Sequence, residues 1–158
     1  MNDSIKTGLC FGLTSGIITT LGLMVGLHSG TNSKLVVMGG ILTIAVADAF
    51  SDALGIHVSE ESKKDITEKE VWGATLSTFF SKFIFALTFI VPVLFLELHK
   101  AVFVSVLWGL LVLGILSFFI ARKQGTSPFY VVFEHIFIAV LVICITHYTG
   151  AWIAQNFV

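Results

Sequence analysis

The fold is decided by an uncharged stretch at residues 101–121, which reads AVFVSVLWGLLVLGILSFFIA. About 20 apolar residues in a helix cross a hydrocarbon core of about 30 Å, so this stretch is long enough to span a bilayer. Working outward from it, further apolar runs of similar length occur on both sides. Together they predict membrane-spanning segments at about residues 8–27, 35–56, 71–96, 101–121 and 129–154.

The composition leads to the same fold class. Of the 158 residues, 56% are hydrophobic and 12% are charged, which is about half the charge of an ordinary soluble domain. In lipid the backbone must satisfy its own hydrogen bonds, and no run alternates as a barrel strand would, so the segments are predicted to be helices. We expect an all-α, polytopic membrane protein with five transmembrane helices, whose residues 1–158 form one transmembrane domain.

Basic residues predict how the chain is oriented. Most of them fall at the end shared by the N-terminus and by the second and fourth connections. These are Lys6, Lys63, Lys64, Lys69, Arg122 and Lys123, against Lys34 and Lys100 at the other end. Because cytoplasmic loops carry the excess of basic residues, the N-terminus is predicted to be cytoplasmic.

The longest connection, residues 57–70, is then cytoplasmic as well. Its acidic residues, Glu60 and Glu61 among them, are candidates for the place where cations gather before they enter the membrane. A mixed run of acidic and basic residues is more often a solvated helix extension, and that alternative stays open.

Several function classes are excluded. The formal net charge of −1 and the lack of a basic stripe argue against nucleic-acid binding. Cys10 and Cys144 form neither a disulfide framework nor a zinc-finger pattern. No nucleophile motif is visible, so we expect a membrane protein that is not an enzyme and holds no resident cofactor.

Small residues recur every fourth position in the first segment, in two series with a phase shift between them. The series are Gly8, Gly12, Gly16 and Gly22, Gly26, Gly30. Such spacing lets helix backbones approach closely in lipid. We favour a seam between two copies of the chain, which makes a homodimer the expected state. Ordinary close packing inside one bundle is the alternative.

Ionisable residues inside the predicted spans carry most of the functional argument. Each costs about 2.5 to 3.5 kcal/mol on insertion scales, so such residues usually mark ion pathways. They are Asp48 and Asp52 in the second segment, Lys82 in the third, and Glu134 and His135 in the fifth.

Asp48 and Asp52 are four residues apart, so their carboxylates share one helix face, about 6 Å from each other. Two neighbouring anions in a low dielectric repel unless a cation lies between them. This is the arrangement that a divalent-metal or proton-coupled site needs. The hydroxyls of Ser51 and Ser59 keep the neighbouring surface polar.

Glu134 is predicted at about the same depth in the membrane as Asp52, with His135 beside it. Imidazole together with carboxylates suits Fe²⁺, Mn²⁺ or Zn²⁺ better than Mg²⁺ or Ca²⁺. We therefore predict a metal site made of Asp48, Asp52, Glu134 and His135. A hydrogen-bonded core histidine is the alternative for His135.

Lys82 has two interpretations. It is either a tethered counter-charge that occupies the carboxylates when metal is absent, or one half of an internal pair with Asp48 that only holds the bundle together. The second interpretation leaves Asp52 and Glu134 unexplained, so we expect the first.

Parts of the chain resemble the vacuolar iron transporter family. GLTSG at residues 12–16 and LGL at residues 21–23 are similar to its first helix, and AFSDALG at residues 49–55 is similar to its second. The five helices, the cytoplasmic N-terminus and the closing Gly150-Ala151-Trp152 agree with it. The resemblance implies a homodimer that exports Fe²⁺, and often Mn²⁺, in exchange for protons, along a groove between two protomers lined by their first two helices.

This sequence departs from the family pattern at three places. Ser15 stands where the family usually has an aspartate, Asp52 where it often has methionine, and Ile56 where it often has glutamate. The ligand set is therefore expected to be rearranged, with the carboxylate moved to the second helix and Ser15 lining the pathway. The connection at residues 57–70 is too short for the large cytoplasmic metal-binding insertion of some relatives.

We expect an integral, multi-pass protein of the cell membrane or of an acidic compartment. Its partners are lipid, a second copy and a divalent metal ion, and its expected function is proton-coupled export of Fe²⁺ or Mn²⁺. A proton or monovalent-cation carrier that uses the same carboxylates is one rival interpretation. A membrane scaffold whose buried charges only set helix register is the other.

Overall fold

A computed structural model describes residues 3–157. In this part of the chain every element is helical. The helices are α1 (Asp3–Thr31), α2 (Lys34–Glu61), α3 (Glu68–Thr88), α4 (Ile90–Phe95), α5 (Leu98–Gln124) and α6 (Pro128–Phe157). With α3 and α4 counted as one span, five segments are long and apolar enough to cross a membrane. The predicted all-α class and the five spans are confirmed.

Most of the helices extend beyond the predicted apolar runs, although α4 ends at Phe95, one residue before the predicted end of the third run. Between the second and third segments, α2 continues to Glu61 and α3 begins at Glu68. The predicted connection at residues 57–70 is therefore reduced to residues 62–67. At its end the backbone N–H and the hydroxyl of Thr67 both donate to Glu70 Oε2, at 3.0 and 2.7 Å. Polar caps like this one, not the apolar run, decide where the helix begins.

The third predicted segment is not one unbroken helix. It is divided at Phe89 into α3 and α4. Pro92 explains the break, because it has no N–H to donate and its ring clashes with the carbonyl four residues earlier, that of Thr88. At the far end, Lys34 Nζ donates to the carbonyl oxygens of Leu94 and Leu96 at 3.2 and 3.1 Å. A lysine of α2 thus satisfies carbonyls that the short helix leaves free.

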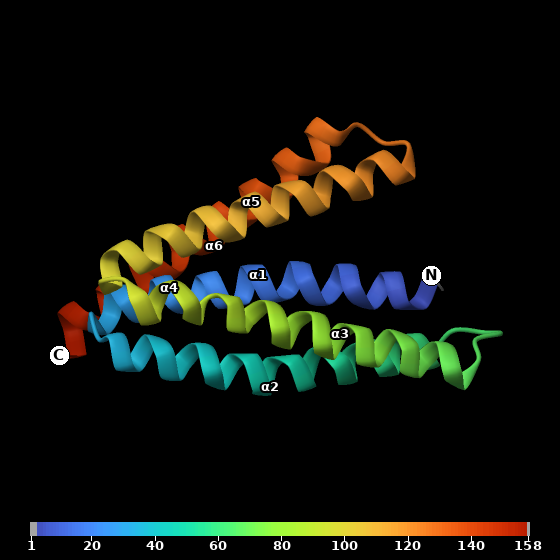
Figure 1. The fold of residues 1–158 in the computed structure, drawn as a ribbon, viewed down its shortest axis with the longest axis horizontal. Coiled ribbons are helices and arrows are strands. Elements are labelled where there is room, and N and C mark those ends of the chain that lie inside the picture. Colours follow the sequence, from blue (N-terminus) through green and yellow to red (C-terminus); the bar gives the residue numbers. More distant parts are fainter. Residues whose placement is uncertain (1–2, 158) are drawn as a thin grey trace.

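Helix α1 occupies the centre of the bundle. Figure 1 shows the α2–α3 pair on one side of it and the α5–α6 hairpin on the other. The first glycine series faces α3: a Cβ on Gly12 would lie 2.6 Å from the carbonyl oxygen of Thr78. The second series faces α6: a Cβ on Gly22 would lie 3.0 Å from Val142 Cγ1. The glycines thus pack against other helices of the same chain, and our expectation that they form the seam of a dimer is wrong.

The two ends of the bundle differ in how many basic residues they carry. One end holds the N-terminus with residues 62–67 and 125–127, and the other holds the C-terminus with residues 32–33 and 96–97 (Figure 1). We call the first the basic end. Its basic residues are Lys6, Lys63, Lys64, Lys69, Arg122 and Lys123, and they lie among the acidic residues Asp3, Glu60, Glu61, Asp65, Glu68 and Glu70.

Candidate ion site at the α1–α2–α3 junction

Lys82 is the centre of the candidate site. It lies on α3, and it is only 1% exposed. Its ammonium donates to Ser15 Oγ of α1 at 2.8 Å and to Asp52 Oδ2 of α2. It also forms an ion pair with Asp48 Oδ2 at 2.5 Å. One cation therefore ties three helices together inside the apolar span.

Small residues make this arrangement possible. The buried positions of α2 nearest the two aspartates are Ala45, Ala49 and Ala53, and these small residues bring the backbone of α2 close to its neighbours. On α1, a Cβ at Gly16 would lie 3.3 Å from Lys82 Cγ, so the glycine leaves room for the lysine stem. The two aspartates project from the same stretch of α2, one helical turn apart, as the spacing predicts.

The charges in this cluster do not balance. Two carboxylates face one ammonium, so the group carries one excess negative charge when all three are ionised. Asp48 is the less satisfied of the two carboxylates, because its buried Oδ2 lies near the ammonium without forming a hydrogen bond. An unbalanced anionic pair in a low dielectric is a site that a further cation would stabilise.

The carboxylates are accessible from one side. The side chain of Asp48 is 27% exposed and that of Asp52 is 19% exposed. Asp48 and Ser51 line a groove of about 750 Å³ between α1 and α2. The other residues lining this groove are Thr19, Leu23, Leu27, Val36, Gly40, Thr43, Ile44 and Ala47. The lysine approaches both carboxylates from inside the bundle, and the groove reaches Asp48 from the other side.

Glu134 and His135 lie elsewhere. Their helix, α6, packs on α1 and α5, on the opposite side of α1 from α2 (Figure 1). Glu134 is exposed. The Nδ1 of His135 lies 2.7 Å from Ser117 Oγ, and that hydroxyl already donates to the Leu113 carbonyl, so the imidazole is the donor. His135 is thus a hydrogen-bonded histidine within the hairpin, which was the alternative interpretation.

The four predicted metal ligands therefore do not converge in a single chain. Among residues 3–157, no three His, Cys, Asp or Glu side chains are placed to hold one metal ion. The prediction compared depths along the membrane normal, and Asp52 and Glu134 do belong to the spans that it named. It had no information on which side of α1 each helix packs.

The remaining predicted residues, Ser59, Glu60 and Glu61, also lie apart from the cluster around Lys82. Ser59 is exposed at the end of α2, and its carbonyl accepts from Ser62 Oγ at 2.8 Å. Glu61 is exposed, but Glu60 is buried and accepts from Lys63 Nζ at 2.6 Å. Glu60 is therefore not an open point for cation entry, because α2 continues to Glu61 and turns its side chain inward.

Sequence reasoning missed His57. Its Nδ1 lies 2.9 Å from the hydroxyl of Thr75, which donates to the carbonyl of Val71, so the imidazole again donates. The ring also packs edge-on against Trp72, with centroids 4.9 Å apart. The signal was present, because His57 continues the four-residue spacing of the buried alanine stripe on α2. The site therefore has a polar extension towards the basic end.

The comparison with known proteins gave a match that covers mainly α1 and α2. The sequence model of the VIT family matches residues 8–73. This region contains Ser15, Asp48 and Asp52, but it ends before Lys82. No curated protein matches the chain.

The family match and the five spans describe a multi-pass integral membrane protein. The match covers the part of the chain that supplies the paired carboxylates and the groove beside them. Residues 8–73 thus carry the sequence pattern of the VIT family, which is consistent with a member of the vacuolar iron transporter family.

Proposed function

We propose that this protein transports divalent transition-metal ions, Fe²⁺ or Mn²⁺, out of the cytoplasm in exchange for protons. The VIT family match suggests metal-ion transport across a membrane. The observation that carries the finer proposal is the pair Asp48 and Asp52, which is balanced by only one ammonium and of which Asp48 lines a groove. Placing carboxylates at this depth in the membrane costs free energy, and binding of a transported cation explains why they are there.

The chemistry of the donors sets the class of ion. Two carboxylates and the hydroxyls of Ser15 and Ser51 are oxygen donors, which suit Mn²⁺ and Fe²⁺ better than copper. One chain supplies too few of them to surround such an ion. Water, or the same groove of a second copy, would supply the rest, and this supports the proposed homodimer.

Lys82 acts as the tethered counter-charge in this proposal. When the ion leaves, the ammonium pairs with both carboxylates, as the structure has it. When an ion arrives, it takes over the carboxylates, and the ammonium keeps its hydrogen bond to Ser15 Oγ. Protons compete for the same oxygens, so metal binding is expected to weaken as the proton concentration rises.

Flux in proteoliposomes tests the proposal. Purified protein is reconstituted, and uptake of Fe²⁺, Mn²⁺, Zn²⁺ and Ca²⁺ is measured for the wild type, Asp52→Asn and Asp48→Asn. Asp65→Asn is the matched control, because Asp65 is exposed and has a φ of 60°, which asparagine adopts readily. Both intramembrane variants should lose most of the metal flux, and the control should keep it. Unchanged flux in Asp52→Asn would show that the site is wrong.

One observation favours a second candidate. Lys82 is fully buried and bound to three side chains, as expected of a purely structural tie or of a carrier that moves only protons. Thermal unfolding separates these cases, since a metal transporter is stabilised by Mn²⁺ and a proton carrier or scaffold is not. A proton carrier would still show proton flux that depends on Asp52, and a scaffold would show none.

A further inference from the structure

A cleft opens between α1 and α5 at the basic end. Figure 1 shows the α5–α6 hairpin diverging from α1 towards residues 125–127. The cleft there has a volume of about 780 Å³. Its walls are mainly apolar, with Leu9, Cys10, Leu13, Leu116, Phe119 and Ile120. Its polar lining residues are Asp3, Lys6, Thr7, Lys123 and Gln124.

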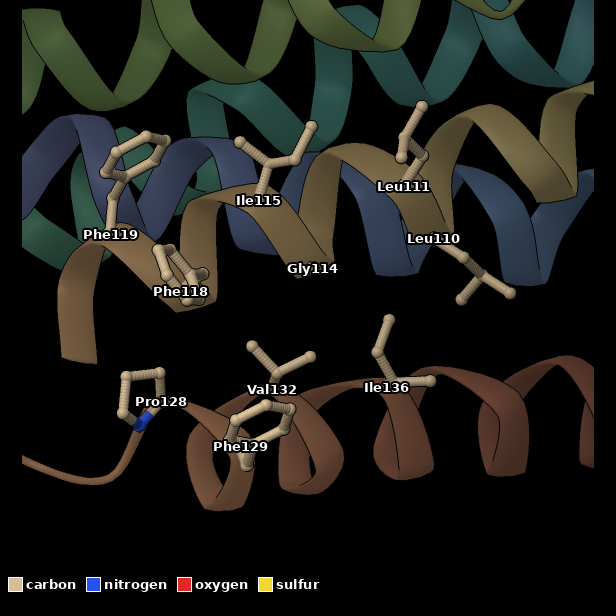
Figure 2. Close-up of a pocket in the computed structure, with 10 residues that line it drawn as sticks. All are labelled: Leu110, Leu111, Gly114, Ile115, Phe118, Phe119, Pro128, Phe129, Val132 and Ile136. Carbon is tan, nitrogen blue, oxygen red and sulfur yellow. The ribbon is translucent and has the colours of Figure 1, made fainter. Parts of the chain in front are cut away.

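A second apolar slot lies on the other side of α5. Figure 2 shows it between α5 and α6, with Phe118 and Leu110 of α5 pointing towards Val132 and Ile136 of α6. Its volume is about 480 Å³, and all its lining side chains are apolar. Phe119 lines both this slot and the cleft against α1. The last turns of α5 are thus poorly covered by protein on two sides.

Two lysine side chains, Lys6 and Lys123, lie at the mouth of the α1–α5 cleft. The side chain of Lys6 is 30% exposed, and its Nζ lies 2.6 Å from Asp3 Oδ1. Lys123 of α5 lines the same cleft. Two lysines and one aspartate therefore lie at the mouth, and these three side chains together carry one net positive charge. The mouth has the charge that attracts an anion.

The depth of these groups matches a lipid molecule. Lys6 lies two residues before the apolar run of the first span, and Lys123 lies two residues after that of the fourth, where headgroups are found. Leu13 is seven residues further along α1, about 10 Å deeper at the rise of a helix, where acyl chains lie. A basic mouth above an apolar slot between helices is the usual form of an anionic headgroup site.

We propose that the α1–α5 cleft binds an anionic glycerophospholipid, with its phosphate between Lys6 and Lys123 and an acyl chain against Leu13 and Leu116. A bound lipid would fill the space between the hairpin and α1 and stabilise their relative position. This proposal rests on the membrane location of the helices and not on the proposed metal transport. Its test therefore does not depend on the roles of Asp48 and Asp52.

Native mass spectrometry of the full chain tests it. Detergent-purified protein is mixed with phosphatidylglycerol or with phosphatidylcholine carrying the same acyl chains, and the retained lipid is counted per chain. The double variant Lys6→Gln/Lys123→Gln removes the basic mouth. Lys64→Gln/Lys69→Gln is the matched control, because it removes the same charge from exposed positions at the same end of the bundle.

The wild type and the control should retain phosphatidylglycerol in preference to phosphatidylcholine. If each lysine contributes about fivefold, retention in the double variant should fall about 25-fold. Equal retention of both lipids by the wild type would overturn the proposal without reference to any variant. An equal loss in the control would overturn it too, because the effect would then be one of overall charge.

A soluble anion separates the headgroup from the whole lipid. Thermal unfolding of the wild type is measured with inorganic phosphate and with phosphatidylglycerol micelles at the same phosphate concentration. Stabilisation by the lipid alone supports a site that also uses the apolar slot. Equal stabilisation by inorganic phosphate would overturn the lipid assignment, because the walls of the cleft would then contribute nothing.

Discussion

Replacing Lys82 by methionine removes the buried ammonium and keeps a long unbranched side chain. The two carboxylates then face each other without a cation. Breaking a buried ion pair by removing one partner costs about 3–5 kcal/mol. Because Asp48 and Asp52 are 27% and 19% exposed, partial solvation places the expected loss near the lower bound, at about 3 kcal/mol. For a chain of this length that corresponds to a fall in Tm of about 6–12 °C.

The same variant should respond more strongly to metal. In the wild type a divalent ion must displace the ammonium, and in Lys82→Met it does not. At a concentration 100 times its Kd, Mn²⁺ should stabilise the variant by about 2.7 kcal/mol. The triple variant Asp48→Asn/Asp52→Asn/Lys82→Met removes all three charges, so it should regain most of the lost stability and no longer respond to Mn²⁺.

The assay is thermal unfolding in detergent, followed by tryptophan fluorescence with and without Mn²⁺. Lys64→Met is the control, since Lys64 is exposed at the basic end. A Tm for Lys82→Met within about 2 °C of the wild type would refute the idea that the ammonium holds the carboxylates. A response to Mn²⁺ no larger than that of the wild type would refute the competition between ammonium and metal.

Three further predictions concern packing and the remaining polar residues. Gly12→Ala should cost about 1–3 kcal/mol in chemical unfolding, because its Cβ would meet the Thr78 carbonyl at 2.6 Å, whereas Gly55→Ala has nothing within 4 Å and should not destabilise. Ser15→Ala removes a partner of a buried ammonium and should lower stability by about 1–3 kcal/mol, with Ser15→Thr measured beside it as the variant that keeps the hydroxyl. Glu134→Gln should leave both Tm and metal flux unchanged, because α6 packs on the opposite side of α1 from Asp48 and Asp52, and a loss of flux with normal Tm would refute this separation.

The five spans could be predicted because bilayer thickness sets a length that apolar runs display directly. The break at Phe89 could also have been predicted from Pro92, although hydropathy alone passes over it. The true ends of α2 and α3 depend on capping hydrogen bonds such as those between Thr67 and Glu70. Those bonds lie outside the apolar pattern, so the predicted connection was too long.

The pairing of Asp48 with Asp52 could be predicted because it is local, set by the turn of a single helix. That Lys82 reaches both aspartates depends on the register between α2 and α3, which no local pattern contains. The glycine series predicted close approach correctly, because the absence of a Cβ is local as well. Which helix approaches is a matter of the bundle's order, and both partners proved to belong to the same chain.

The chain's own order of residues was enough to establish a helical membrane protein with carboxylates at an unfavourable depth, since length, hydropathy and helical spacing are properties of single segments. Only the tertiary structure decided that Lys82 joins Asp48 and Asp52, while Glu134 remains on the other side of α1. Depth in a membrane is one coordinate and can be counted along each helix. The position of a helix around its neighbours is set by side-chain packing between segments distant in the sequence.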